Sequence, residues 1–206
     1  MEFSADILMQ FMDATTGREA RPMLFEALRH TEQRGQAIDL GCGPGNDVLE
    51  LLKAGFHVLA TDGHVAAIER TRERADDAGF ADRLTTRLAR FAQVHLEPNS
   101  ADLIHAGFAL PFTTVAEFDH IWTSICTALR PGAVFAGQFF GVKDDWAHDE
   151  ERSELRAFTR AEVDNLLQAF EICHFEEVDR DGETATGTEK HWHVFHVVAR
   201  RPRDPA

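Results

Sequence analysis

Residues 37–45 read Ala37-Ile38-Asp39-Leu40-Gly41-Cys42-Gly43-Pro44-Gly45 and are the most informative part of the chain. A short apolar run ends, and three glycines follow at alternate positions. Directly after them, apolar residues take up helical spacing, at Val48, Leu49, Leu51 and Leu52. The pattern predicts a strand, a tight turn and a helix. Glycines in such a turn let backbone N–H groups lie against a small ligand, because a Cβ would hold the ligand off the main chain.

The spacing of the glycines separates this turn from other nucleotide-binding turns. A dinucleotide turn has the order G-x-G-x-x-G, whereas this one runs Gly41-x-Gly43-x-Gly45. A phosphate loop requires a lysine directly after its last glycine, and the first lysine here is Lys53. A Rossmann-like turn for another nucleotide remains the alternative.

A second signal lies one strand further along. Residues 57–62 predict a strand closed by Asp62, and Gly63 follows. A carboxylate at this place, about 20 residues beyond the glycine turn, can accept hydrogen bonds from ribose hydroxyls. The alternative is that Asp62 is only the N-cap of the next helix, and the two roles are compatible.

The order D-x-G-x-G-x-G from Asp39 to Gly45 resembles the first motif of the class I S-adenosylmethionine-dependent methyltransferases. The resemblance extends from about residue 36 to 200 and includes the turn at residues 129–132, which is similar to the family's L-x-P-G element. It implies S-adenosylmethionine as cofactor and a methyl group transferred to a small-molecule acceptor. It also implies cofactor-binding roles for several residues, which are Asp39, Gly41, Cys42, Gly43, Gly45, Asp62 and Gly63.

Two segments, residues 106–112 and 191–196, are similar to a bacterial small-molecule branch akin to the tellurite-resistance-type methyltransferases. One position departs from the family. After the third strand the family often carries an acidic residue near the adenine, whereas this chain has Leu88-Ala89-Arg90-Phe91. We therefore expect Phe91 to pack on the adenine ring or to offer its backbone N–H.

Strand and helix patterns alternate along the rest of the chain, which is typical of an α/β fold. Strands are expected at residues 84–88, 101–106, 133–140, 169–178 and 192–199. Helices are expected from Val115 to Leu129, with apolar residues at intervals of three and four, and after the capping box of Thr159 and Glu162. With the resemblance, this predicts one doubly wound Rossmann-like domain over residues 1–206. Its seven-stranded, mostly parallel sheet has the antiparallel last strand inserted between strands five and six. Residues 1–34 are expected to form an N-terminal helical cap, and residues 35–200 the core.

Composition and charge narrow the function further. The 206 residues are 44% hydrophobic, enough to fill a core, and carry a formal net charge of −14. An acidic chain is a poor match for nucleic acid, which is bound by clustered Lys and Arg. No apolar run or leader predicts a membrane span or secretion, and three widely spaced cysteines favour reduced thiols in the cytoplasm.

No residue is assigned as catalytic, because an activated methyl group needs an aligned acceptor more than a strong base. Three candidate general bases are His105, His148 and His191, since segments 105–112, 141–148 and 181–190 are expected to reach the site. His105 also counts as a cofactor-site candidate. Arg18 is expected to pair with the cofactor carboxylate, the alternative being a solvated residue in the first turn of a helix.

Other interpretations stay open. His191 and His193 share one face of a strand, but without a helical H-x-x-x-H pair or a cysteine partner no metal site is expected. The acidic run 144–151 is expected to be a solvated, mobile loop in which Trp146 can act as a lid. The rivals to a methyltransferase are a non-catalytic S-adenosylmethionine-binding protein and an NAD-dependent oxidoreductase. The acceptor and the oligomeric state do not follow from the sequence.

Overall fold

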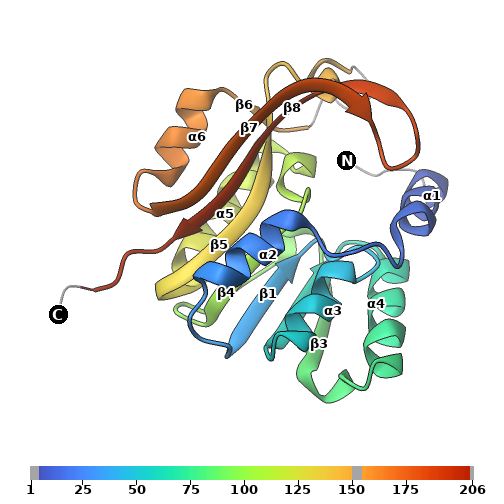
Figure 1. Ribbon diagram of the computed structural model, residues 1–206, viewed down its shortest axis with the longest axis vertical. Helices are drawn as coiled ribbons and strands as arrows, with labels where there is room; N and C mark the ends of the chain where they lie inside the picture. The colour runs from blue at the N-terminus through green and yellow to red at the C-terminus, as the bar shows by residue number, and fades with distance from the viewer. Residues whose placement is uncertain (1–4, 150–154, 205–206) are drawn as a thin grey trace.

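The computed structural model describes residues 5–149 and 155–204, and one mixed sheet forms its centre (Figure 1). The order of the strands is β3-β2-β1-β4-β5-β8-β7, and the two-residue β6 pairs with β5. The strands are β1 (Gln36–Leu40), β2 (His57–Asp62), β3 (Leu84–Leu88), β4 (Ala101–Ala106), β5 (Leu129–Gly141), β6 (Ala157–Phe158), β7 (Glu171–Glu183) and β8 (Glu189–Arg200). The α-helices are α1 (Ala5–Thr15), α2 (Pro22–His30), α3 (Asn46–Lys53), α4 (Val65–Asp77), α5 (Val115–Ala128) and α6 (Arg160–Leu167). Short 3-10 helices are η1 (Ala81–Arg83), η2 (Phe91–Gln93), η3 (Leu110–Phe112) and η4 (Asp145–His148).

The sheet has the predicted topology. Strands β1 to β5 pair in parallel, and the last strand, β8, runs antiparallel between β5 and β7. The prediction of a doubly wound α/β fold with an inserted antiparallel last strand is confirmed. Helices α2, α3 and α4 cover one face of the sheet, and α5 and α6 cover the other (Figure 1). The division into a cap (residues 1–34) and a core (residues 35–200) stays a prediction; α1 and α2 fall within residues 1–34, and α2 packs on the sheet.

Helix α5 shows how the sequence pattern builds the core. Of its predicted apolar stripe, Phe118, Trp122 and Ile125 are buried against the sheet, where the rings of Phe118 and Phe158 lie 4.8 Å apart. Val115 is 58% exposed, because it stands at the first turn, where the helix has not yet reached the sheet. Leu129 is buried as well, but as the first residue of β5.

Two boundaries differ from those expected. Strand β5 begins at Leu129 rather than Ala133, and the turn with Gly132 (φ 83°) becomes an irregularity in its pairing with β4. The loop expected at residues 181–190 shrinks to residues 184–188, because β7 continues through Glu183. That extension is polar, so hydrophobic periodicity could not reveal it. It is held by cross-strand pairs such as Asp181 with His191.

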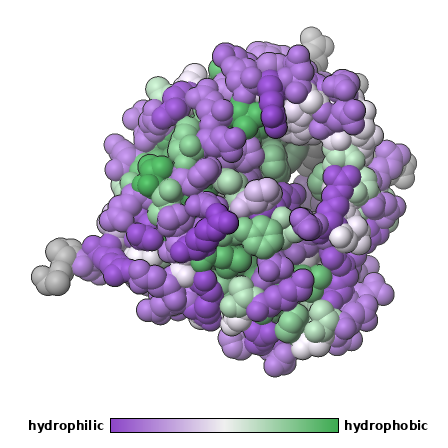
Figure 2. Space-filling model, in the orientation of Figure 1, coloured by the Kyte–Doolittle hydropathy of each residue, from purple (hydrophilic) through white to green (hydrophobic). Residues whose placement is uncertain are grey.

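The surface on the α2 side is mostly hydrophilic, with hydrophobic side chains gathered around α2 near the centre of the view (Figure 2). Phe25 on α2 is 39% exposed. Among the described residues, no helix combines the length and the apolar character that a membrane span requires.

Candidate functional site

The glycine turn lies at the carboxyl edge of the parallel strands, between β1 and α3. Its first two N–H groups, those of Gly41 and Cys42, donate to the carbonyl of Thr61 at 2.8 and 3.0 Å. All three glycines have positive φ, of 73°, 51° and 80° for Gly41, Gly43 and Gly45. Such angles disfavour any residue with a Cβ.

The three glycines have different neighbours. A Cβ on Gly41 would lie 2.6 Å from that of Ala109, and one on Gly45 would lie 2.7 Å from Oγ1 of Thr71. A Cβ on Gly43 would meet no atom within 4 Å. The outer glycines are therefore required by packing, whereas the middle one borders open space.

The carboxylate of Asp62 braces this turn from the end of β2. Its Oδ2 accepts a hydrogen bond from the N–H of Gly43 at 3.0 Å, and its Oδ1 accepts one from the N–H of His64 at 2.9 Å. Gly63 packs beside Arg90, and the tip of the Phe91 ring lies 3.8 Å from where Gly41 would carry a Cβ. The structure thus brings Asp62, Gly63 and Phe91 around the glycine turn.

Close to the turn lies a network of ionisable side chains, formed by the buried Asp39, Asp47 and His105 and the half-buried Arg21. His105 Nδ1 lies 2.9 Å from Oδ1 of Asp39 and 3.9 Å from Oδ2 of Asp47. Arg21 donates its backbone N–H to Asp47 at 2.8 Å and forms an ion pair with it. Among the described residues, Asp39 Oδ2 and His105 Nε2 have no hydrogen-bond partner.

Burial and charge oppose each other in this network. Burial lowers the pKa of His105, but Asp47 and Asp39 outweigh burial and the net pKa is raised. Burial raises the pKa of Asp47, but His105 and Arg21 outweigh it and the net pKa is lowered. For Asp39 burial prevails, and the pKa is raised. At the centre of the network His105 therefore lies between two carboxylates, hydrogen-bonded to Asp39 and 3.9 Å from Asp47.

The remaining predicted residues lie in other surroundings. Arg18 is exposed between α1 and α2 and donates to the carbonyl of Ala185 at 3.2 Å. Cys42 has its side chain in the core, where burial raises the pKa of the thiol well above the usual range, and its cofactor-binding role stays a prediction. His148 Nε2 lies 2.7 Å from the carbonyl oxygen of Val142.

His191 is bound on both sides. Its Nε2 lies 2.8 Å from Asp179 and its Nδ1 lies 2.7 Å from Asp181, and these two hydrogen bonds raise its pKa. In this arrangement neither ring nitrogen has a lone pair for an acceptor proton.

An aromatic cluster is formed by Phe108, Phe112, Phe140, Trp146 and Trp192 from four different segments. It adjoins the glycine turn at Phe108, because the next residue, Ala109, lies against Gly41. Ring centroids within it are 5.5 to 6.2 Å apart. Phe108 follows β4 and has a φ of 53°, which is strained for a residue with a side chain. Its N–H donates to Oε1 of the buried Gln138 at 2.8 Å, and Arg21 lies 5.8 Å above its ring.

Lys190 extends into the aromatic cluster, with Nζ 3.8 Å from the ring centroid of Trp192 and 4.2 Å from that of Trp146. It forms an ion pair with Asp144, and both side chains are buried. The expectation that residues 144–151 form a solvated loop is therefore wrong at Asp144, because the aromatic rings shield this ion pair from water. Glu150 and Glu151 lie outside the described residues.

Sequence reasoning missed Arg21 and Lys190. Neither stands in a recognisable motif, and only the fold brings them to the site.

In Figure 2 the surface is hollowed between the β7–β8 hairpin and the start of α2. No group of three or more His, Cys, Asp or Glu side chains suited to a metal ion occurs in residues 5–149 and 155–204.

Comparisons with known proteins agree with this geometry. The model of the methyltransferase domain family matches residues 37–132. Trans-aconitate 2-methyltransferase of Variovorax paradoxus (strain S110) is 32% identical over 119 residues, which are 56% of this chain and 42% of that protein. The match thus spans less than half the length of this curated relative.

Two solved structures share the fold. TehB from Haemophilus influenzae has a TM-score of 0.74 at 17% identity, over 88% of this chain and 62% of its own. A Burkholderia thailandensis 1,6-didemethyltoxoflavin-N1-methyltransferase, with bound 1,6-didemethyltoxoflavin and S-adenosylhomocysteine, has a TM-score of 0.67 at 20% identity, over 96% of this chain and 86% of its own. At these identities the likeness concerns the fold. The predicted resemblance to the class I S-adenosylmethionine-dependent methyltransferases is thereby confirmed for residues 37–132, which match the methyltransferase domain family, and for the fold.

Proposed function

We propose that this protein transfers a methyl group from S-adenosylmethionine to a small-molecule acceptor, by in-line displacement in a desolvated site. The observation that carries the proposal is the glycine turn, in which Gly43 borders open space between packed neighbours. Such an opening, next to a carboxylate at the end of β2, suits a ligand that lies on the main chain.

The residues present fit this cofactor. Asp39 Oδ2 is a buried acceptor without a partner in the described structure, and it suits the ammonium group of the cofactor. Both oxygens of Asp62 keep a further lone pair for ribose hydroxyls. The ring of Phe91 offers a flat apolar surface for the adenine. The pairing of Arg18 with the cofactor carboxylate stays a prediction.

When bound, S-adenosylmethionine supplies a methyl group that is already activated by its sulfonium. The protein then has to align the acceptor and exclude water. The aromatic cluster supports the second task, because its rings pack against one another beside the turn. A small-molecule acceptor agrees with the names of two relatives, which refer to trans-aconitate and to 1,6-didemethyltoxoflavin.

The test is calorimetric titration of the protein with S-adenosylmethionine and S-adenosylhomocysteine, using Gly43→Ala as the variant. We expect micromolar binding near one ligand per chain, weakened by about tenfold or more in Gly43→Ala, since a methyl group would stand in the ligand's space. Gly79→Ala is the matched control, because Gly79 also has positive φ and nothing within 4 Å of its Cβ position, but ends α4 away from the site.

Both variants carry the same backbone strain, of about 1–2 kcal/mol. A loss of affinity in Gly43→Ala alone therefore reports the ligand and not the strain. Equal affinities in the wild type and Gly43→Ala would contradict the proposed position of the cofactor. No binding by the wild type at millimolar ligand would reject the proposed function.

A further inference from the structure

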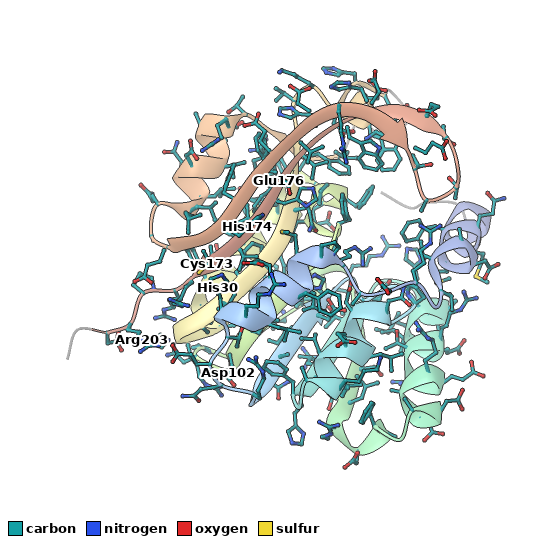
Figure 3. The ribbon with its side chains drawn as sticks, viewed as in Figure 1. His30, Asp102, Cys173, His174, Glu176 and Arg203 are labelled. Carbon is teal, nitrogen blue, oxygen red and sulfur yellow. The ribbon has the colours of Figure 1, made fainter. Side chains whose placement is uncertain are left out.

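His196 lies on the face of the sheet that α2 only partly covers. In the register of the sheet it stands directly opposite Gln138 of β5 and Glu176 of β7. Directly paired residues of antiparallel strands share a face, so these three side chains point to one side. It is the side of α2, because Val198 and Ala136, two residues along on each strand, belong to the core under α2. Figure 3 labels Glu176 and His174 on β7, on the side of the sheet seen in that view.

The ring of His196 contacts the segment that reaches the cofactor. It packs edge-on against the ring of Phe108 at 5.9 Å between centroids, and Phe108 is held by the hydrogen bond to Gln138. Two residues before Phe108 is the end of β4, whose His105 pairs in register with Asp39 of β1. Phe108 therefore links His196 to the glycine turn, because the residue after Phe108, Ala109, lies against Gly41.

The nitrogens of His196 are open, in contrast to those of its neighbours on β8. His191 and His193 have ring nitrogens bound to carboxylates. Within the described ranges, His196 makes no hydrogen bond through its ring, although it is half-buried. A histidine in such a position can accept a proton from a ligand.

The charges around His196 favour the neutral ring. Burial lowers its pKa from the ordinary value of 6.5, and His174 and Arg180 of β7 lower it further, whereas Glu176 acts in the opposite direction. On the other elements that face it, Gln138 is uncharged, and Arg21 lies beyond the ring of Phe108. A neutral imidazole is the form that acts as a base, and Glu176 then faces the imidazolium that results.

We propose that His196 is the general base of the methyl transfer and that the acceptor therefore carries a hydroxyl, a thiol or a heteroaromatic N–H. This inference rests on the proposed function. In the step, the acceptor atom forms a bond to the methyl carbon and the carbon–sulfur bond breaks, its electron pair passing to sulfur. The acceptor proton passes to a ring nitrogen of His196, and from there to water.

The proposal separates this site from one built for carboxylate acceptors. A carboxylate is already ionised at neutral pH and needs no base, whereas phenols and most N–H groups are protonated there. The chemical class of the acceptor is therefore inferred from His196 on β8 and not from the acceptors of the relatives.

The first test uses tritiated S-adenosylmethionine with a panel of phenols, thiols, heteroaromatic N–H compounds and carboxylic acids. We expect methylation of the first three groups, and a kcat lower by about 10²–10⁴-fold in His196→Asn at neutral pH. The wild-type kcat should rise as the pH rises through a pKa below 6.5, and His196→Asn should lack that inflection. His57→Asn, at the exposed amino end of β2, is the control that should match the wild type.

The second test needs no acceptor. In NMR spectra of protein with 13C-labelled histidine rings and saturating S-adenosylhomocysteine, the His196 signal, assigned through His196→Asn, should titrate below 6.5. It should also shift on addition of S-adenosylhomocysteine.

Titration of His196 above neutral pH in that complex would overturn the proposal, whether or not an acceptor is found. So would methylation of carboxylic acids alone, or unchanged kcat in His196→Asn. A wild type that does not bind S-adenosylmethionine would instead reject the proposed function itself, which calorimetry detects separately.

Discussion

At Asp62 one carboxylate serves two backbone N–H groups, that of Gly43 in the glycine turn and that of His64 before α4. Asp62→Ala should therefore lower stability as well as affinity. We expect a loss of about 1–3 kcal/mol in the free energy of unfolding, because two backbone donors lose a charged acceptor. Affinity for S-adenosylmethionine should fall by about 10- to 100-fold. Denaturant unfolding and calorimetry measure the two effects.

Asp62→Asn separates the loss of stability from the loss of affinity, since its amide oxygen can still accept one of the two backbone hydrogen bonds. It should recover part of the stability and less of the affinity. Asp82→Ala, at an exposed aspartate in η1, should change neither quantity. Full affinity in a folded Asp62→Ala protein would remove the ribose assignment.

The buried pair of His105 and Asp47 predicts a dependence of stability on pH. The raised pKa of His105 means that its contribution is complete below 6.5 and is lost as the pH rises through the folded-state pKa. The lowered pKa of Asp47 means that its contribution is present above 3.8 and is lost only in acid.

As the pH rises above 6.5, the stability advantage of the wild type over His105→Gln should therefore shrink. Thermal unfolding across this range checks the expectation, with His57→Gln as the exposed control. An advantage that stays constant or grows with pH would show that His105 is not protonated in the folded state.

At the scale of residues, the sequence predicts those site residues whose positions depend only on their neighbours along the chain. The glycines and Asp62 follow from a strand–turn–helix unit of about 25 residues, in which spacing along the chain fixes spacing in the molecule. Arg21 could not be found in this way. It stands three residues from Arg18, and only the packing of α2 decides which of the two meets Asp47.

At the scale of elements, the capping box of α5 is a test of local stability. Thr114 accepts a hydrogen bond from the N–H of Glu117, whose side chain accepts one from the N–H of Thr114. Thr114→Ala should lower the free energy of unfolding by about 1 kcal/mol, since the first turn loses a partner. Thr123→Ala, exposed on the same helix, is the matched control and should change it little. Equal losses in the two variants would show that the cap adds nothing.

Elements were predictable where burial repeats with a fixed period. Strand β4 is buried at every position, and its bounds are those expected. The outer half of β7 was not predictable, because residues 179–183 carry no apolar side chain that could show a period, and pairing with β8 keeps them extended. Likewise, because side chains alternate along a strand, His196 and His193 of β8 must lie on opposite faces of the sheet. Only the positions of α2 and Phe108 in the structure show which of these faces is next to the site.

At the scale of the whole molecule, ligand binding should stabilise the fold. A ligand at about 100 times its Kd adds about 2.7 kcal/mol to the free energy of unfolding. For a chain of 206 residues this corresponds to a rise in Tm of about 5–10 °C. We expect this rise with S-adenosylhomocysteine and none with NADH. The opposite pattern in a thermal-shift experiment would favour an oxidoreductase.

The aromatic cluster has a spectroscopic consequence. The chain has three tryptophans and no tyrosine, so its near-ultraviolet fluorescence comes from three indoles. Trp122 belongs to the core under α5, whereas Trp146 and Trp192 stand 5.5 Å apart around the ammonium group of Lys190. Replacing Trp122 by Phe would leave Trp146 and Trp192, so that the remaining fluorescence would report on the aromatic cluster alone. The tryptophan emission of the Trp122→Phe protein could then distinguish the binding of an acceptor at the cluster from unfolding of the chain.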